Sequence, residues 1–160
     1  ESAEKYDIAY KEAKNKTWKH KYTTSNSKYT IKGLKEGRLY DVKVAAMSTV
    51  YGKLTAGKYS GTAHRHFVLV KTPVYTAKKS AIGVSVKKIK GVSGYEVLLS
   101  KDKNLKNREI IELKSASKTK ITIKKLKKNT FYFLAVRSYK TYRGNKYTGI
   151  RTGIKKVKTK

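Results

Sequence analysis

The chain has 160 residues, of which 38% are hydrophobic, and its 40 Lys and Arg against 10 Asp and Glu give a formal net charge of +30. Evenly spread Val, Ile, Leu and Tyr and a single Pro exclude a disordered polycation, which lacks the apolar residues needed for a core. Without Cys and without an apolar run as long as a membrane span, the sequence also excludes disulfides and predicts no transmembrane helix.

The first half of the chain is predicted to form short β-strands. Apolar residues alternate with polar ones, which is the period of a strand with one buried face. Turn signals separate the runs, among them Ser25-Asn-Ser27 and Lys35-Glu-Gly37. The five predicted strands are centred on residues 6–10, 18–22, 29–31, 40–44 and 62–67.

The second half continues this pattern with more strands. Pro73 suits the start or edge of an opening strand, where its missing N–H does no harm. Residues 68–160 have room for seven strands, the clearest of them at residues 82–86, 95–99, 111–113, 121–123, 132–136 and 154–157. No segment has an apolar stripe of period 3.6, so we predict an all-β protein.

An internal repeat divides the chain into two domains. Residues 29–44 align with residues 121–136, and a period of about 92 residues fits one small domain per copy. Short strands at this spacing predict two consecutive Ig-like β-sandwiches, residues 1–69 and residues 70–160. Nothing before Tyr6 corresponds to the first two strands of the second copy. We therefore expect Glu1 to be a fragment boundary, or another chain to supply the missing strands to the open first domain.

Two Leu-x5-Tyr motifs, Leu34 to Tyr40 and Leu126 to Tyr132, precede strands in the two copies. Together with Gly91–Val97 and the similar endings Lys58–Ser60 and Lys146–Thr148, they resemble tandem fibronectin type III domains. The likeness extends to the Lys-rich domains of surface and secreted proteins of Gram-positive bacteria. It implies a structural tyrosine corner, in which the Tyr hydroxyl bonds to the upstream main chain. It also implies an extracellular, non-catalytic module next to other domains of a larger protein.

One position departs from this family. Where the family usually has a Trp in its second strand, the chain has Val86, so the second core is built with a smaller residue. Trp18 cannot replace that Trp, because it belongs to the other copy and to a later strand. The fold prediction holds, since an aliphatic residue also fills an inward-facing site.

Catalytic motifs are absent from the sequence. The ten acids form no paired-carboxylate motif, and there is no Gly-rich phosphate loop, HExxH motif or nucleophile elbow. We therefore expect neither an enzyme nor a cofactor.

Two aromatic or histidine patterns have both a functional and a structural interpretation. His64 and His66 share one face of a strand and offer two zinc ligands, but a plain polar strand face is the favoured interpretation. Residues 18–22 interleave aromatic and basic side chains, as a platform for single-stranded nucleic acid or glycan does. An inward-facing aromatic row with a charged outer row explains the same alternation and is favoured.

Tyrosines near the predicted hairpins are candidates for stacking on sugars or for contacting proteins. The alternative is cross-strand pairing that stiffens the hairpins, and it is favoured. Arg143-Gly-Asn145 resembles the integrin-binding tripeptide of some family members but lacks its Asp, so a plain turn is expected. The candidate ligand contacts are Tyr51, Tyr139, Tyr142, Arg143 and Tyr147.

The charge predicts attraction to polyanions. Lys greatly outnumbers Arg, which suggests a diffuse field rather than bidentate recognition of bases or phosphates. Our leading hypothesis is a spacer or adhesion module of a bacterial cell-surface or secreted protein whose Lys-rich faces bind anionic wall polymers or glycans. The alternatives are a nucleic-acid-binding module and a subunit that polymerises through its open first domain. A charged patch confined to one face favours the nucleic-acid-binding alternative, whereas uniform charge favours a spacer.

Overall fold

The computed structural model describes residues 3–23, 28–67 and 70–160, and of residues 64–67 the main chain only. In this part of the chain thirteen strands and no helix are found, which confirms the predicted all-β class. The chain divides into two compact units, the first made of Glu1–Lys35 and Leu39–Arg65 and the second containing His66–Lys160. The predicted boundary after residue 69 falls at residues outside the described part.

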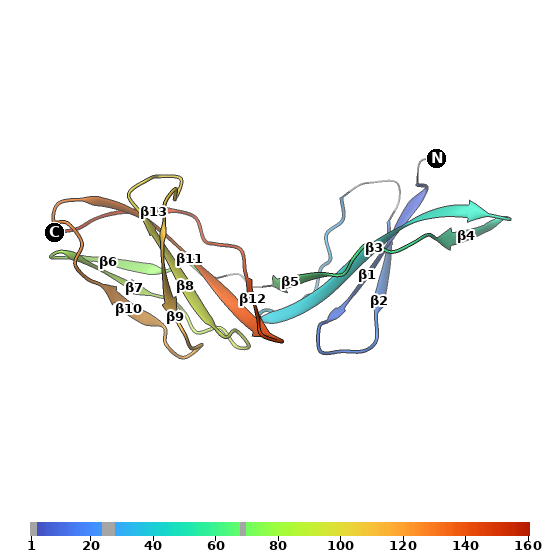
Figure 1. Cartoon of the computed structure of the whole chain (residues 1–160), viewed down its shortest axis with the longest axis horizontal. Coiled ribbons are helices and arrows are strands. Elements are labelled where there is room, and N and C mark those ends of the chain that lie inside the picture. Colours follow the sequence, from blue (N-terminus) through green and yellow to red (C-terminus); the bar gives the residue numbers. More distant parts are fainter. Residues whose placement is uncertain (1–2, 24–27, 68–69) are drawn as a thin grey trace. The chain divides into compact units, whose positions relative to one another are not determined.

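The first unit is a single antiparallel sheet. Its strand order is β2-β1-β3-β4, and β5 also pairs with β3 (Figure 1). The long strand β3 therefore holds the unit together, since it bonds to three others. The bounds are β1 (Lys5–Glu12), β2 (Lys19–Thr23), β3 (Arg38–Val50), β4 (Lys53–Ala56) and β5 (Ala63–Phe67).

The second unit is a complete sandwich of two sheets. One sheet has the order β10-β7-β6, and the other has the order β12-β11-β8-β9 with β13 also on β11 (Figure 1). The bounds are β6 (Val74–Lys78), β7 (Ala81–Ser85), β8 (Gly94–Ser100), β9 (Glu109–Leu113), β10 (Lys120–Ile123), β11 (Phe131–Tyr142), β12 (Asn145–Thr148) and β13 (Lys155–Lys158).

The core of the second unit lies between these two sheets. Ile82 from one sheet and Leu134 and Val136 from the other are fully buried. Val86, at the position where a Trp was expected by resemblance, is 8% exposed and belongs to the same core. Burying each such side chain stabilises the fold by about 1.5–3 kcal/mol, which accounts for a stable sandwich without disulfides.

Matching hydrogen bonds align the two units residue by residue. The Ser60 N–H donates to Val44 O (2.7 Å), and the Thr152 N–H donates to Val136 O (2.8 Å). The returning bonds also match, from Val44 N–H to Ser60 Oγ and from Val136 N–H to Thr152 Oγ1, both 3.0 Å. The strands β1, β2, β3, β4 and β5 are thus the counterparts of β8, β9, β11, β12 and β13.

The alignment also separates two segments of similar sequence. The similar endings Lys58–Ser60 and Lys146–Thr148 are not equivalent, because Ser60 takes the place of Thr152. Lys146–Thr148 lies in β12 and pairs with β11, whereas Lys58–Ser60 follows β4. The two sequences look alike because both alternate an outward Lys with a half-buried Tyr.

The described residues of the first unit include no counterpart of β6 and β7, as the sequence predicted. The strand predicted at residues 29–31 is not formed, and this prediction was wrong. Its counterpart β10 pairs only with β7. Without a β7 partner the segment has no ladder of hydrogen bonds to join, although its side chains alternate correctly.

Candidate functional site

Three segments of the second unit meet at one end of the sandwich. They are the turn after β6 (residues 78–80), the loop before β11 (residues 124–130) and the final segment (residues 158–160), which lie together at the left in Figure 1. Hydrogen bonds tie them to one another: Ser80 N to Lys160 O (3.1 Å), Lys160 N to Lys78 O (3.0 Å), Leu126 N to Ser80 O (3.0 Å), Thr159 N to Thr130 O (3.0 Å) and Thr159 Oγ1 to Lys127 O (2.6 Å).

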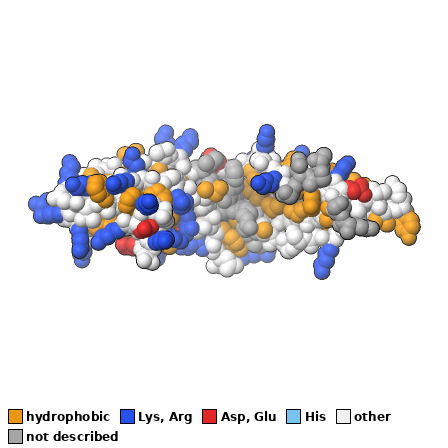
Figure 2. Space-filling model, turned by 90° about the horizontal axis from the view of Figure 1, so that it is seen from above, with side chains coloured by type: hydrophobic (Ala, Val, Ile, Leu, Met, Phe, Trp, Pro, Cys, Tyr) orange, Lys and Arg blue, Asp and Glu red, His pale blue; other side chains and the backbone are white. Residues whose placement is uncertain are grey.

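These segments carry eight lysines and no acid, and every one of the eight is exposed. We call this set the lysine end. Figure 2 shows blue Lys and Arg side chains gathered around the same end of the molecule. Lysines brought this close raise the local positive potential well above that of isolated surface charges. The members are Lys78, Lys79, Lys124, Lys125, Lys127, Lys128, Lys158 and Lys160.

The predicted tyrosine-corner residues position the loop of the lysine end. Tyr132 is 5% exposed in the core, and its hydroxyl accepts a hydrogen bond from the Lys127 N–H at 3.1 Å. Leu126 is half-buried against the same core. The first unit repeats the arrangement, since the Tyr40 hydroxyl accepts from the Lys35 N–H at 2.9 Å. Leu34 is half-buried there.

Buried acids lie on the polar faces of the two large sheets. In the second unit Glu96 is 3% exposed and accepts hydrogen bonds from Arg137 Nε (2.7 Å) and Lys146 Nζ (3.2 Å). In the first unit Asp7 is 3% exposed and accepts from Tyr59 Oη. Each of these buried carboxylates is held by hydrogen bonds to partners in its own unit.

The aromatic residues at 18–22 face outward, which contradicts the favoured sequence interpretation. The register pairs Asp7 with Tyr22 and Ile8 with Lys21, so Lys21 lies on the face of Ile8 and Tyr22 lies on the opposite face. Tyr22 is 62% exposed. His20 lies on the same outer face as Tyr22 and stacks on it, with ring centroids 6.5 Å apart. Strand alternation was read correctly, but only the pairing register decides which row faces in.

These outer-face aromatics interact mainly with neighbours in the same sheet. His20 Nδ1 lies 2.8 Å from an Asp7 carboxylate oxygen. Lys43 Nζ lies 4.6 Å from the Trp18 ring centroid and 4.2 Å from that of Tyr59. Cation–π contacts of this kind link neighbouring strands and stabilise the sheet. The cluster thus has a structural role, and Tyr22 is its most exposed member.

Tyr139 is buried, which corrects its prediction as an exposed ligand contact. It is 5% exposed, and its cross-strand partner is Gly94. A Cβ at Gly94 would lie 2.7 Å from the Tyr139 hydroxyl, so the missing side chain makes room for the ring. Burial, and next the Glu96 charge, raise the pKa of Tyr139. It is a packing residue.

Of the other predicted contacts, three lie at the β11–β12 hairpin and one lies in the first unit. Tyr142 and Tyr147 are half-buried and share one face of the β11–β12 hairpin, where Lys140 pairs with Tyr147. Arg143 is exposed at the turn and lies 5.3 Å from the Tyr142 ring. Tyr51 is fully exposed in the other unit.

The two hairpin turns have the same geometry. Tyr51 and Gly52 have φ of 50° and 74°, and Arg143 and Gly144 have φ of 49° and 76°. Positive φ at both central residues is the two-residue type I′ turn, which matches the twist of the flanking strands. Arg143-Gly144-Asn145 therefore forms the plain hairpin turn that the sequence favoured.

The possible zinc ligands His64 and His66 have side chains outside the described part of the chain. Among the described residues no group of three His, Cys, Asp or Glu is placed to hold a metal ion. No described helix is long and apolar enough to span a membrane.

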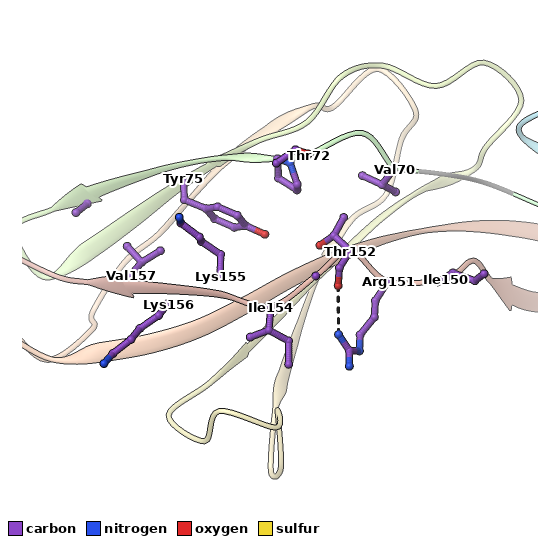
Figure 3. Close-up of a pocket in the computed structure, with 13 residues that line it drawn as sticks. Val70, Thr72, Tyr75, Ile150, Arg151, Thr152, Ile154, Lys155, Lys156 and Val157 are labelled. Atoms are coloured by element: carbon purple, nitrogen blue, oxygen red, sulfur yellow. Dashed lines mark hydrogen bonds between the residues drawn. The ribbon is translucent and has the colours of Figure 1, made fainter.

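A cavity of about 770 Å³ opens at the edge of the second unit, between β6 and residues 150–157 (Figure 3). Its lining includes Val70, Tyr75 and Val157, with Lys155 beside Tyr75 in Figure 3. The Tyr75 hydroxyl is covered and has no hydrogen-bond partner among the described residues. Burial raises the pKa of Tyr75. Among the described residues, the ionisable side chains that line the cavity are those of Tyr75, Arg151, Lys155 and Lys156.

Sequence reasoning missed the convergence of lysines. Sequence patterns alone did not connect the lysines of the loop at residues 124–128 with those at residues 78–79 and 158–160. Only the topology shows that the turn after β6 and the final segment both hydrogen-bond beside this loop. The available signal was the absence of any acid from all three segments.

A family model and a relative each match part of the chain. Residues 1–60 match the sequence model of the fibronectin type III domain. A stretch of 45 residues, 28% of this chain, is 47% identical to the titin homolog of Caenorhabditis elegans. That stretch makes up 0% of the relative's length to the nearest per cent, so the chain spans only a minute part of this relative.

Solved structures resemble the chain over nearly its whole length. The two-domain fibronectin type III segment of chicken tenascin is 18% identical to this chain, with a TM-score of 0.52. The match covers 97% of this chain and 84% of the tenascin segment. The FN1–FN3 domains of chicken CNTN1 are 20% identical with a TM-score of 0.48, and the match covers 97% of this chain and 56% of that one. The tenascin likeness, together with the two units described above, confirms the predicted fold of tandem Ig-like, fibronectin type III sandwiches.

Proposed function

We propose that this protein is a non-catalytic spacer or adhesion module of a larger bacterial cell-surface or secreted protein, and that it binds anionic polymers through the lysine end. The observation that carries the binding proposal is the convergence of eight exposed lysines, without an acid in their segments, on one end of the second unit. Charge gathered in this way favours polyanion binding over a uniformly charged spacer.

The family match supports the module part of the proposal. Fibronectin type III domains generally serve as spacers or binding modules in extracellular proteins and are typically non-catalytic. The fold alone does not fix a function, so the ligand has to come from the chemistry of this chain. The chain carries a formal net charge of +30, so an anionic ligand fits it best.

Binding is expected to be electrostatic and weakly selective. Lysine ammonium groups act as point charges on flexible stems, and they attract phosphate or carboxylate wherever it lies. Each phosphate contact releases counterions, so affinity falls steeply as salt rises. A nucleic acid would bind by the same physics without sequence preference, and it is the alternative ligand.

The test is binding to purified Gram-positive cell walls, with and without their anionic polymers, across a salt series. The proposal predicts binding that disappears when the polymers are removed and when salt is raised. Equal binding to stripped walls would contradict it and would point to glycan contacts. A nucleic acid of equal charge density that outcompetes the wall polymer would favour the alternative ligand.

A second candidate function rests on a different observation. The first unit presents an apolar sheet face that no described strand covers, so it can assemble with strands of another chain. This assembly is independent of the lysine end.

A further inference from the structure

The cavity of about 770 Å³ in the second unit lies between the edges of its two sheets (Figure 3). One edge is β6, which pairs with β7, and the other is β13, which pairs with β11. The two edges are joined at one end, where the Lys160 N–H donates to Lys78 O at 3.0 Å. Away from this end the lining continues to Val70 and Ile150. The volume falls within the range of about 300–1,000 Å³ that is typical of small-molecule sites.

The walls of this cavity are largely apolar. Seven of the thirteen lining residues are aliphatic, aromatic or Pro. Val70 belongs to the buried core cluster, and Tyr75 and Val157 pack against that cluster. An alkyl chain placed along these walls leaves water, and this burial is favourable in proportion to the apolar area covered. A wholly hydrophilic polymer gains nothing from such walls, so they favour a ligand with an apolar part.

One lysine of the lining lies on the inward row of its strand. Lys155 pairs with Leu134, which is fully buried in the core. Because side chains alternate along a strand, Lys155 shares the core-facing side of β13 with Val157. Its side chain lies beside Tyr75 in Figure 3. In the part of the chain that the structure describes, no ion pair is found for Lys155.

The charged residues of the lining all have the same sign, and they are Arg151, Lys155 and Lys156. Arg151 is exposed, and its Nη1 donates to Thr152 O at 3.2 Å. Lys156 Nζ lies 4.0 Å from the centre of the Phe131 ring, so Lys155 and Arg151 are the cations left to face a ligand. Apolar walls exclude water, and the attraction between these cations and an anion is therefore less screened than on an open surface.

We propose that this cavity binds the acyl chain of an anionic amphiphile, with the carboxylate or phosphate head group beside Lys155 and Arg151. The apolar walls select the chain, and the two cations select the charge of the head group. This inference goes beyond the binding of anionic polymers at the lysine end, which requires charge alone. Fatty acids and phospholipids both supply this chemistry.

The experiment titrates the 160-residue chain, isotopically labelled for NMR, with dodecanoate and with dodecyl phosphate below their micelle-forming concentrations. The salt concentration is about 0.15 M, which screens charges more than about 8 Å apart. The expected result is saturable binding with shifts concentrated at residues 70–77 and 150–157. Tighter binding of dodecanoate identifies a fatty acid as the source of the ligand, and tighter binding of dodecyl phosphate identifies a phospholipid.

Acetate is the control ligand, because it has the carboxylate head without the chain. At the same concentration it should leave the amides of residues 70–77 unshifted. Equal shifts with acetate and dodecanoate would overturn the proposal, since they would show that the apolar walls take no part in binding.

Matched substitutions locate the head group. Lys155→Met removes the inward charge and keeps the length of the side chain, and it should weaken dodecanoate binding at least about fivefold. Lys158→Met is the control on the same strand, since Lys158 pairs with Phe131 and lies on the opposite side of β13 from Lys155. It should leave the affinity unchanged. Both lysines are exposed, so neither substitution should prevent folding.

Two further outcomes would overturn the site. Equal weakening by Lys155→Met and Lys158→Met would mean that the ligand responds only to the total charge of the protein. Shifts that rise without saturation, or that spread over both units, would show that the cavity is not a binding site. Lys155 would then be explained as an inward-pointing charge that keeps this sheet edge from pairing with other strands.

Discussion

The Lys127 N–H donates a hydrogen bond of 3.1 Å to the Tyr132 hydroxyl, so a core residue holds the loop that carries four members of the lysine end. The equivalent bond between Lys35 and Tyr40 in the first unit is 2.9 Å long. Each bond satisfies a main-chain N–H that would otherwise lie unpaired beside the core. The Leu-x5-Tyr motif therefore stabilises the fold. It affects the surface only because it holds the lysine-bearing loop in place.

Replacing Tyr132 with Phe should lower the free energy of unfolding of the second unit by about 1 kcal/mol, because one buried hydrogen bond is lost and the ring remains. Chemical denaturation measures the change. Tyr51→Phe is the control, since Tyr51 is fully exposed, and its effect should stay within about 0.5 kcal/mol. Equal effects of the two substitutions would argue against the tyrosine corner as a stabilising contact.

Gly94→Ala should destabilise the second unit by about 1–3 kcal/mol through overpacking. An added Cβ would lie 2.2 Å from Leu113 O and 2.7 Å from the Tyr139 hydroxyl, so β9 or the Tyr139 ring would have to move. Gly153→Ala is the matched control, because nothing lies within 4 Å of its added Cβ. Thermal unfolding of both variants measures the difference, and a neutral Gly94→Ala would contradict the packing described for Tyr139.

The Tyr59 side chain gives the first unit a pH dependence. Its hydrogen bond to Asp7, desolvation, the Asp7 charge and the nearby Tyr22 raise the pKa of Tyr59 from 10.0 to about 12. The folded state therefore holds this proton more tightly than the unfolded state. Its contribution to stability is complete below pH 10 and is lost as pH rises from 10 to about 12.

Tyrosinate absorbance measured during a base titration checks this assignment. The difference between the parent chain and Tyr59→Phe should show one tyrosine with a midpoint near pH 12. Asp7→Asn should move that midpoint down, toward 10, because the charge and the strong acceptor are both removed. A midpoint near 10 in the parent chain would contradict the Asp7–Tyr59 contact.

Glu96→Gln should destabilise the second unit by about 1–3 kcal/mol, because Arg137 and Lys146 lose their common buried partner. The pKa of Tyr139, which the Glu96 charge helps to raise, should fall in the same variant. Glu109→Gln is the control, since Glu109 is exposed. Urea denaturation and tyrosinate titration give the two readouts, and a stable variant with an unchanged Tyr139 pKa would refute the described pairing.

Local patterns were enough to predict the all-β class, the repeat and the absence of two opening strands. Those inferences depend on alternation and on residue-by-residue similarity, which a sequence carries directly. The prediction of a strand at residues 29–31 was wrong. In the other unit β10 is a strand because it pairs with β7, and the alternation of side chains alone does not supply such a partner.

The candidate sites were less predictable. Tyr139 and Tyr22 both lie in strands of alternating sequence, yet Tyr139 is buried opposite Gly94 and Tyr22 is exposed on an edge strand. Register and topology decide such outcomes, and neither can be read from composition. The lysine end shows the same limit, because residues 78–80 and 158–160 become neighbours only through the fold.

The most direct test of the account compares two charge-deleted chains for binding to poly(glycerol phosphate) across a salt series. One variant replaces Lys124, Lys125, Lys127 and Lys128 with Ala. The other variant replaces four exposed lysines with Ala and so removes the same amount of charge elsewhere. Two of them follow β7 and two lie between β9 and β10: Lys87, Lys88, Lys114 and Lys118.

If the polymer binds at the lysine end, the slope of log K against log salt should become shallower by about three units in the first variant. In the second variant the slope should change by less than about one unit. Equal losses would mean that the polymer senses only the total charge of the protein. That result would contradict a polyanion site at the lysine end.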